Sequence, residues 1–134
     1  MREYYAGQRA LKKIISHNEG NQIIKKIIEN ALNLRVPIEF NQISNLLELD
    51  GIDINTTGIN GLTLLHISIK QQNLVITKLL LNKGANCNAQ DNFGATPIHY
   101  VSYFGCSTNF VETLSDHGCN LSWPDSLGKT PLHY

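Results

Sequence analysis

The chain has 134 residues, 42% of them hydrophobic and 16% charged, and its eleven basic residues balance eleven acidic ones. That length and composition predict one globular domain with a buried core and exclude a disordered chain. Zero net charge excludes the strongly basic surface of a typical nucleic-acid-binding domain. The sequence contains no run of about 18 apolar residues, so we expect no membrane insertion. No apolar stretch follows the first residues, so we also expect no secretory signal.

The N-terminal region predicts basic helices. Residues 1–35 carry seven Lys or Arg against three Glu, a net charge of +4, whereas residues 36–134 carry a net charge of −4. Apolar residues recur with helical spacing from residue 23 to residue 32, with charged residues opposite. A further helix is expected over residues 4–16. The basic residues either contact an anionic surface or form the solvated face of a helix.

The three cysteines are Cys87, Cys106 and Cys119, and no Cys-x-x-Cys motif joins them. Their odd number and this spacing predict three reduced thiols that pack as small apolar side chains. We therefore expect a reducing, cytoplasmic environment.

A short motif recurs three times in the second half of the chain. Each copy contains a Thr and, three residues later, a His, and the copies are 33 and 34 residues apart. The copies contain Thr63 with His66, Thr96 with His99, and Thr130 with His133. A glycine recurs with the same step, at Gly51, Gly84 and Gly118. A repeat of this length predicts stacked units, because one pair of short helices cannot bury its apolar faces alone.

The repeated residues are of the types that begin and end helices. A Thr hydroxyl can cap the free backbone donors of a first helical turn. Pro97 and Pro131 follow two of the Thr residues, at the first helical position, where a missing N–H costs nothing. Gly84 and Gly118 follow leucine-containing stretches, where a helix ends in a left-handed residue. Each unit is therefore expected to contain two helices.

On these motifs the chain resembles the ankyrin-repeat family, whose repeat carries Gly-x-Thr-Pro-Leu-His and later Leu-Leu, Gly-Ala and Asn-Ala. The segments 79–89 and 91–99 match that pattern most fully. The resemblance implies an all-α ankyrin-repeat solenoid of helix-turn-helix units with short hairpin-like loops and a divergent N-terminal helical cap. The expected units are a cap over 1–35, a divergent partial unit over 36–57, repeats over 58–90 and 91–124, and an incomplete repeat over 125–134.

Three departures from the family pattern stand out. Gly58 occupies the position of Asp91, and Leu64 that of the family's Pro. The second full unit has one extra residue near Cys106, which predicts a longer turn between its helices. Such a turn could bury Tyr103 and Phe104.

The resemblance implies a structural role for the repeated histidines, which in the family hydrogen-bond backbone groups of the neighbouring loop. A metal site is not expected, because it needs three or four ligands around one point and stacked repeats hold these side chains apart. The sequence contains no nucleophile, phosphate-binding or dinucleotide motif. We therefore expect a non-enzymatic protein–protein interaction module without cofactor, metal, small-molecule substrate or nucleic-acid partner.

By resemblance, partners are contacted by the hairpin tips and by the exposed face and ends of the inner helices. The tip positions in this chain are Ile59, Asn60 and Leu62, then Asn92, Phe93 and Ala95, then Ser126, Leu127 and Lys129. The helix-end positions are Lys70, Gln71, Tyr103 and Phe104. Phe93, Tyr103 and Phe104 belong to one unit, so we expect them to share one concave side. Exposed aromatic residues of this kind are typical of binding hot spots.

The third copy of the motif is followed within one residue by Tyr134. Two interpretations are open: a fragment of a longer array, or a partner that covers the last unit. The alternative function is the ankyrin portion of a larger effector or enzyme whose catalytic domain lies beyond Tyr134. The abundance of Ile and Asn is typical of an AT-rich genome, and intracellular bacteria and large viruses carry many such repeats. Delivery into a host cell therefore stays open.

Overall fold

The computed structural model describes residues 17–121, which form six α-helices and one short 3-10 helix without any strand in that range. In chain order these are α2 (His17–Asn33), α3 (Phe40–Leu47), η1 (Ile59–Gly61), α4 (Leu64–Lys70), α5 (Leu74–Asn82), α6 (Pro97–Tyr103) and α7 (Thr108–Asp116). The expectations for residues 4–16 and for the third motif copy lie outside the described residues.

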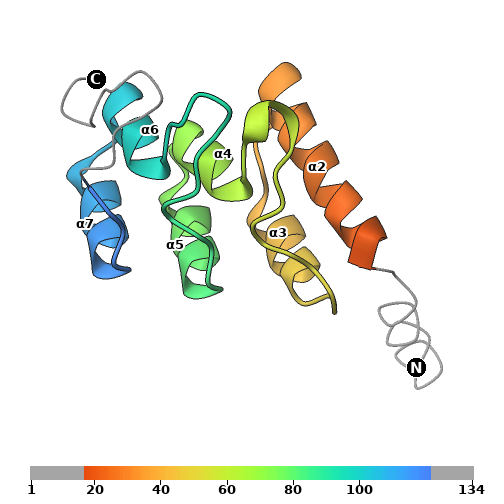
Figure 1. The fold of residues 1–134 in the computed structure, drawn as a ribbon. Helices are drawn as coiled ribbons and strands as arrows, with labels where there is room; N and C mark the ends of the chain where they lie inside the picture. The colour runs from red at the N-terminus through yellow and green to blue at the C-terminus, as the bar shows by residue number, and fades with distance from the viewer. Residues whose placement is uncertain (1–16, 122–134) are drawn as a thin grey trace.

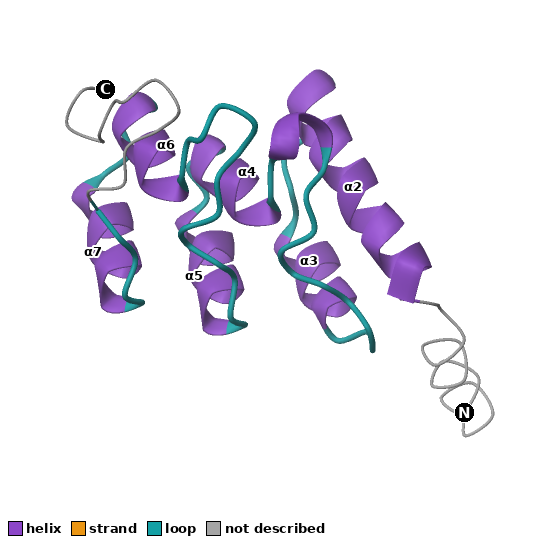
Figure 2. Cartoon of the chain, in the orientation of Figure 1, coloured by secondary structure: helices purple, strands orange, loops and turns teal. Residues whose placement is uncertain are grey.

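The helices form three pairs that stack side by side: α2 with α3, α4 with α5, and α6 with α7 (Figure 1). One row contains α2, α4 and α6, the inner helices, and the other row contains the outer helices α3, α5 and α7. Long loops run from α3 to α4 and from α5 to α6 (Figure 2). The prediction of an all-α solenoid is confirmed, whereas the residue boundaries between its units stay predictions.

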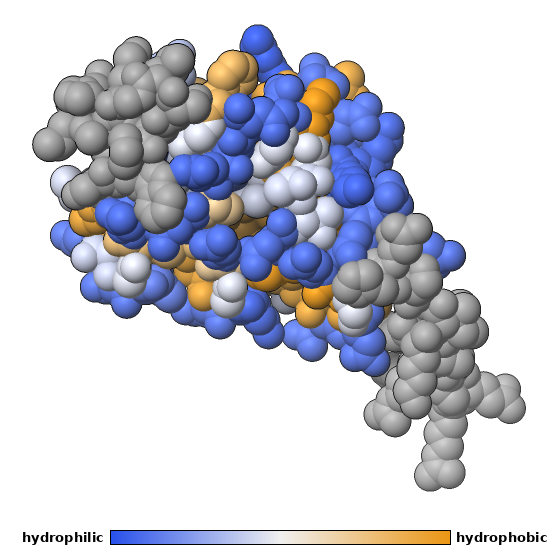
Figure 3. Space-filling view, in the orientation of Figure 1, coloured by the Kyte–Doolittle hydropathy of each residue, from blue (hydrophilic) through white to orange (hydrophobic). Residues whose placement is uncertain are grey.

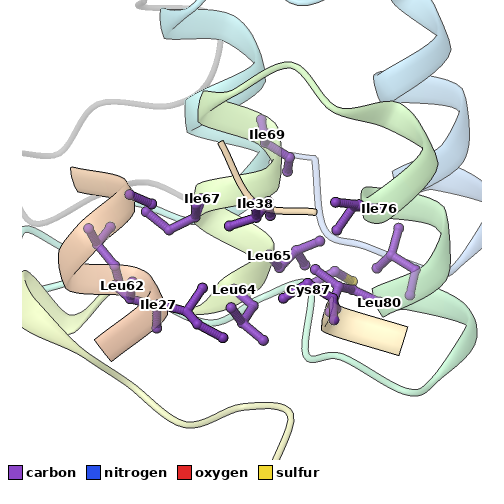
Figure 4. Close-up of a cluster of buried hydrophobic side chains, with 14 of the residues drawn as sticks. Ile27, Ile38, Leu62, Leu64, Leu65, Ile67, Ile69, Ile76, Leu80 and Cys87 are labelled. Atoms are coloured by element: carbon purple, nitrogen blue, oxygen red, sulfur yellow. The ribbon is translucent and has the colours of Figure 1, made fainter. Parts of the chain in front are cut away.

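The core lies along the inner row and is densest around α4. The first six residues of α4, Leu64 to Ile69, are all buried, because α2, α5 and α6 surround this helix. Figure 4 shows several of these side chains with Ile76 and Leu80 of α5. Burying one such Leu or Ile side chain contributes about 1.5–3 kcal/mol. An inner helix surrounded by neighbours is therefore stable although it is only seven residues long.

The helix α2, which carries two Lys and two Glu, closes one side of this core. Ile24 and Ile28 are fully buried, and Lys25 and Lys26 are exposed, so the charges form a solvated helix face. Ile23 differs from the expected apolar stripe, because its side chain is 42% exposed. A Cβ at Gly58 would lie 3.0 Å from the Ile28 side chain, so a larger residue there would require Ile28 to shift.

The extra residue of the second full unit lies in the turn between its helices. That turn spans four residues between α6 and α7, from Phe104 to Ser107, whereas three residues separate α4 from α5. Gln72 in the shorter turn and Gly105 in the longer one both have a left-handed backbone, with φ of 55° and 64°. The Gln72 side chain donates a hydrogen bond to the Phe104 carbonyl (3.3 Å), so the two turns contact each other.

The prediction of three reduced cysteines is wrong. Cys87 and Cys119 form a disulfide, with Cα atoms 5.5 Å apart, and Cys106 alone among the described cysteines is free. The reason is that the loops after α5 and α7 stack directly: the Asn120 N–H donates to Asn88 Oδ1 at 2.9 Å. This contact brings the neighbouring cysteines within disulfide range. The thiols therefore give no support for a reducing environment.

We expect the unfolded, unreduced protein to contain one reactive thiol, that of Cys106, and three after reduction. A disulfide that closes a loop of this length contributes roughly 3–4 kcal/mol to the free energy of unfolding. Reduction should therefore lower the melting temperature, and Cys87→Ala should do so without reductant. Cys106→Ala is the matched control and should change stability little. Three reactive thiols before reduction would contradict the pairing.

Candidate functional site

A buried histidine fixes the start of each of the inner helices α4 and α6. In α4, the Thr63 N–H donates to His66 Nδ1 (3.1 Å), and the His66 N–H donates to Thr63 Oγ1 (3.3 Å). These reciprocal bonds form a capping box. Because Nδ1 accepts, Nε2 carries the ring proton and donates to the Ala95 carbonyl at 3.0 Å. Ala95 belongs to the next unit, so this imidazole joins two repeats.

The same arrangement begins α6. The Thr96 N–H donates to His99 Nδ1 at 3.0 Å, and both side chains are buried. Pro97 occupies the first position of the helix. Gly84 and Gly118 follow the outer helices α5 and α7 with φ of 90° and 76°, the left-handed conformation that ends a helix. Thr130, Pro131 and His133 lie outside the part of the chain that the structure describes.

Burial controls the protonation of the first histidine. His66 is fully buried beside the Tyr100 ring, with centroids 4.9 Å apart, and desolvation lowers the pKa of its imidazole. The hydrogen bond to Ala95 and the charge of Asp91 oppose this shift without reversing it. A protonated ring would lose the Nδ1 acceptor and with it the capping box. The neutral imidazole is therefore the form that holds the units together.

The contribution of His66 to stability should depend on pH. Its folded-state pKa lies below the unfolded value of about 6.5, so below that pH the unfolded chain gains a proton that the folded chain resists. The stabilising effect is complete above pH 6.5 and decreases as the pH falls. We expect His66→Gln to lower the free energy of unfolding by about 2–3 kcal/mol at pH 8.

The measurement is urea unfolding of both proteins from pH 8 to pH 5. The free-energy difference between wild type and His66→Gln should shrink as the solution becomes more acidic. Comparing the two proteins cancels the titration of the other histidines. A difference that stays constant over this range would show that the imidazole does not act as described.

The hairpin-like tips lie beside the inner helices. The Gly58 N–H donates to the Leu62 carbonyl (2.8 Å), and the Asp91 N–H donates to the Ala95 carbonyl (3.0 Å), so both tips close in the same way. The Asn92 N–H donates to the Asn60 carbonyl at 2.9 Å, which joins one tip to the other. The exposed residues of the two tips are Ile59, Asn60, Asn92 and Phe93. Ser126, Leu127 and Lys129 of the third tip lie outside the described residues.

Two tip positions were expected at the surface and are not. Only 3% of Leu62 and 8% of Ala95 is exposed. Each is the residue that closes its tip, so its side chain turns toward the helices. Figure 4 shows Leu62 within the buried cluster. These two side chains form the floor beneath the exposed tip residues.

The ends of the inner helices differ from one another. Tyr103 is 67% exposed, whereas Phe104 is half-buried against Tyr103 and Tyr100, with ring centroids 4.9 and 5.8 Å away. The rings of Tyr100 and Tyr103 thus cover Phe104 in part, whereas Tyr103 itself is mostly exposed. Gln71 is occupied: its Nε2 donates to the Val36 carbonyl and its Oε1 accepts from the Ile38 N–H, both at 2.9 Å. Its amide holds the loop after α2.

The tips and the inner helices α4 and α6 enclose a cavity of about 310 Å³, which we call the tip cavity. Its lining is mainly apolar and includes three aromatic residues of α6 and its following turn. The lining residues are Leu32, Asn60, Leu62, Lys70, Asp91, Phe93, Ala95, His99, Tyr100, Tyr103 and Phe104.

Two charged residues line the tip cavity, and their surroundings differ. The Asp91 carboxylate accepts three hydrogen bonds, from the Phe93 and Ala95 N–H groups (2.9 Å each) and from the Tyr100 hydroxyl (2.6 Å). Lys70 lies over the Phe104 ring, with Nζ 6.0 Å from the centroid. Asp91 therefore supports the tip, whereas the ammonium group of Lys70 faces the cavity.

Sequence reasoning missed the contributions of Asp91 and Tyr100 to this site. Residues three and four apart lie on one helix face, so Tyr100, Tyr103 and Phe104 could have been grouped by spacing. Asp91 was noted only as a family position. Its role in holding both the tip and Tyr100 depends on contacts that the repeat pattern does not specify.

The comparison with known proteins agrees with this architecture. The family profile described as ankyrin repeats (3 copies) matches residues 13–122 and again 76–134. A putative ankyrin repeat protein of fowlpox virus is 33% identical over 91 residues, which cover 66% of this chain and 27% of that protein. A putative ankyrin repeat protein of Rickettsia bellii is 27% identical over 111 residues, which cover 83% of this chain and 50% of the relative.

The stacked helix pairs and hairpin-like tips define a repeat protein of the helical solenoid class. This chain belongs to the ankyrin-repeat family. It spans half or less of the length of the relatives just described.

Ankyrin repeats are in general protein–protein interaction modules, and the family is generally non-catalytic. A tyrosine-protein kinase of Hydra vulgaris is nevertheless 40% identical over 52 residues, 7% of its own length. Within residues 17–121, no group of three or more His, Cys, Asp or Glu side chains could hold a metal ion. No helix in that same range is both long and apolar enough to cross a membrane.

Proposed function

We propose that this protein is a non-enzymatic protein-binding module and that its contact surface is the tip cavity with its rim. The observation that carries the proposal is that residues expected from two hairpin tips and two helix ends surround a single apolar cavity. These residues are Asn60, Leu62, Lys70, Phe93, Ala95, Tyr103 and Phe104.

The exposed aromatic residues support this surface. In the orientation of Figure 1 the surface of the described residues is largely hydrophilic, with apolar patches between (Figure 3). Phe93 and Tyr103 are about two-thirds exposed and line the same cavity. Tyr103 is held edge-to-face by Phe104, so little side-chain entropy would be lost on binding. A partner that covers both rings gains apolar burial at a preorganised site.

Phe93→Ala and Tyr103→Ala should each weaken the binding of a protein partner by about 2 kcal/mol or more, the scale of an aromatic hot spot. The same changes should alter the free energy of unfolding by no more than about 0.5 kcal/mol, because both side chains are exposed. The measurements are titration calorimetry with the partner and thermal melting of each variant.

Val75→Ala is the matched control, because Val75 is also an exposed apolar residue (63%) but belongs to the outer helix α5. It should leave both binding and melting unchanged. A partner that is indifferent to Phe93→Ala and Tyr103→Ala but sensitive to Val75→Ala would place the contact surface on the outer helices and refute the proposal.

A second candidate function rests on the lengths of the relatives. The chain spans 27% of the fowlpox virus protein and 50% of the Rickettsia bellii protein. We propose as the alternative that these repeats are the recognition portion of a larger effector or enzyme. Reading the genomic sequence on both sides of the coding segment tests this. Continued repeats that lead into a domain with a catalytic motif would support it, and in-frame stops would refute it.

A further inference from the structure

We propose that the tip cavity selects an acidic segment of its protein partner. An apolar side chain of that segment would enter between Phe93 and Tyr103, and a neighbouring Asp or Glu would pair with Lys70. This inference rests on the proposed function, since it names the chemistry of the partner for the same surface.

The first argument is the position of Lys70. It is the last residue of α4, where the negative end of the helix dipole favours a cation. Its side chain is half-buried and lies over the Phe104 ring. A carboxylate beside it would form a charge-assisted hydrogen bond.

The second argument is that a second cation lies near Lys70, although Asp91 balances Lys70 within the lining of the tip cavity itself. Lys70 also lines an adjoining cavity of about 340 Å³, whose other charged residue is Arg35. The ion pairs among residues 17–121 are Lys26–Glu29 and Lys83–Glu48, so neither Lys70 nor Arg35 is paired within that range. Residues 36–134 carry a net charge of −4, so this pair of cations is a local feature.

The third argument is that the Asp91 carboxylate is already engaged and is therefore a poor binding group for a basic side chain of a partner. Both of its oxygens already accept hydrogen bonds from its own tip and from Tyr100. The aromatic face of Phe104, which could receive a cation, is already faced by Lys70. A Lys or Arg entering the cavity would approach Lys70, and the Asp91 carboxylate that could attract it already accepts three hydrogen bonds. The occupant that fits is therefore apolar and acidic.

The experiment is a selection of random-sequence display peptides on the full 134-residue chain, followed by affinity measurements with the enriched peptides. The expected peptides combine an aromatic or long aliphatic residue with Asp or Glu close by. Lys70→Glu should lower the affinity for these peptides at least about tenfold, and Lys70→Gln should lower it less. The reason is that a reversed charge repels the acidic residue, whereas a neutral side chain only fails to attract it.

Lys78→Glu is the matched control. Lys78 is an exposed lysine of the outer helix α5 and lines a separate polar cavity with residues of α7. The same charge reversal there should change affinity by less than about twofold. Melting of Lys70→Glu and Lys70→Gln checks that both variants fold, and Lys70→Gln alone carries the test if the other does not.

The outcomes separate this inference from the proposed function. Peptides that are neutral or basic, lose affinity with Phe93→Ala and tolerate Lys70→Glu would overturn the acidic partner and keep the surface. Peptides insensitive to both Phe93→Ala and Lys70→Glu, or no enrichment at all, would overturn both proposals. Binding of the unmodified chain to a second copy of itself at the same surface would also overturn the acidic partner.

Discussion

One buried imidazole sets the register between neighbouring units. His66 uses Nδ1 to begin its own helix and Nε2 to hold the Ala95 carbonyl of the next unit. Both bonds are buried, so a shift of one residue would leave a buried donor or acceptor without a partner, at a cost of about 1–3 kcal/mol. Together with the hydrogen bond from the Asn92 N–H to the Asn60 carbonyl, this side chain fixes the position of the second tip relative to α4.

The tip cavity is a consequence of that register. Ala95 closes the tip and forms part of the cavity floor, so the hydrogen bond that joins the units also places the floor. Asp91 then connects the tip to α6 through the Tyr100 hydroxyl. The exposed rings of Phe93 and Tyr103 therefore stand on elements that are already fixed by hydrogen bonds, which is how a binding surface is preorganised.

The repeat pattern predicted the features that depend on local chemistry, namely where helices begin and end. The Thr and His pairs and Pro97 lie at helix starts, and Gly84 has the left-handed backbone that ends a helix, because capping and backbone sterics act within a few residues. It did not predict which side of a tip each residue faces. Leu62 and Ala95 are buried because the closing hydrogen bond of the tip turns them inward, a feature set by loop geometry.

The sequence also did not predict the particular contacts between neighbouring units. The resemblance implies that the repeats stack, but Gln71 is occupied by the loop after α2, whose conformation the divergent N-terminal sequence does not show. The disulfide was missed for the same kind of reason. Cys87 and Cys119 are 32 residues apart, whereas the motif repeats every 33 or 34, so they are not equivalent positions and no repeat comparison pairs them.

The stack is held by different means on its two sides. Next to the inner helices, His66 joins the units. In the loops after the outer helices, an Asn side chain accepts a backbone N–H of the next loop: Asn55 from Asn86, and Asn88 from Asn120. These His and Asn side chains do not line the tip cavity, whereas Asn60 and Phe104, whose carbonyls also accept bonds from a neighbouring unit, do.

Phe93 and Tyr103 can therefore vary with little effect on stacking, because their side chains are exposed. Phe104 is different, since it supports Tyr103, lies beneath Lys70 and accepts a hydrogen bond from Gln72 at its carbonyl. Its ring contacts Tyr103 and Tyr100 of α6 and lies beneath Lys70. A substitution there would change the shape of the cavity and the packing of α6 together, so under the proposed function Phe93, Tyr103 and Lys70 could vary only while Phe104 is retained.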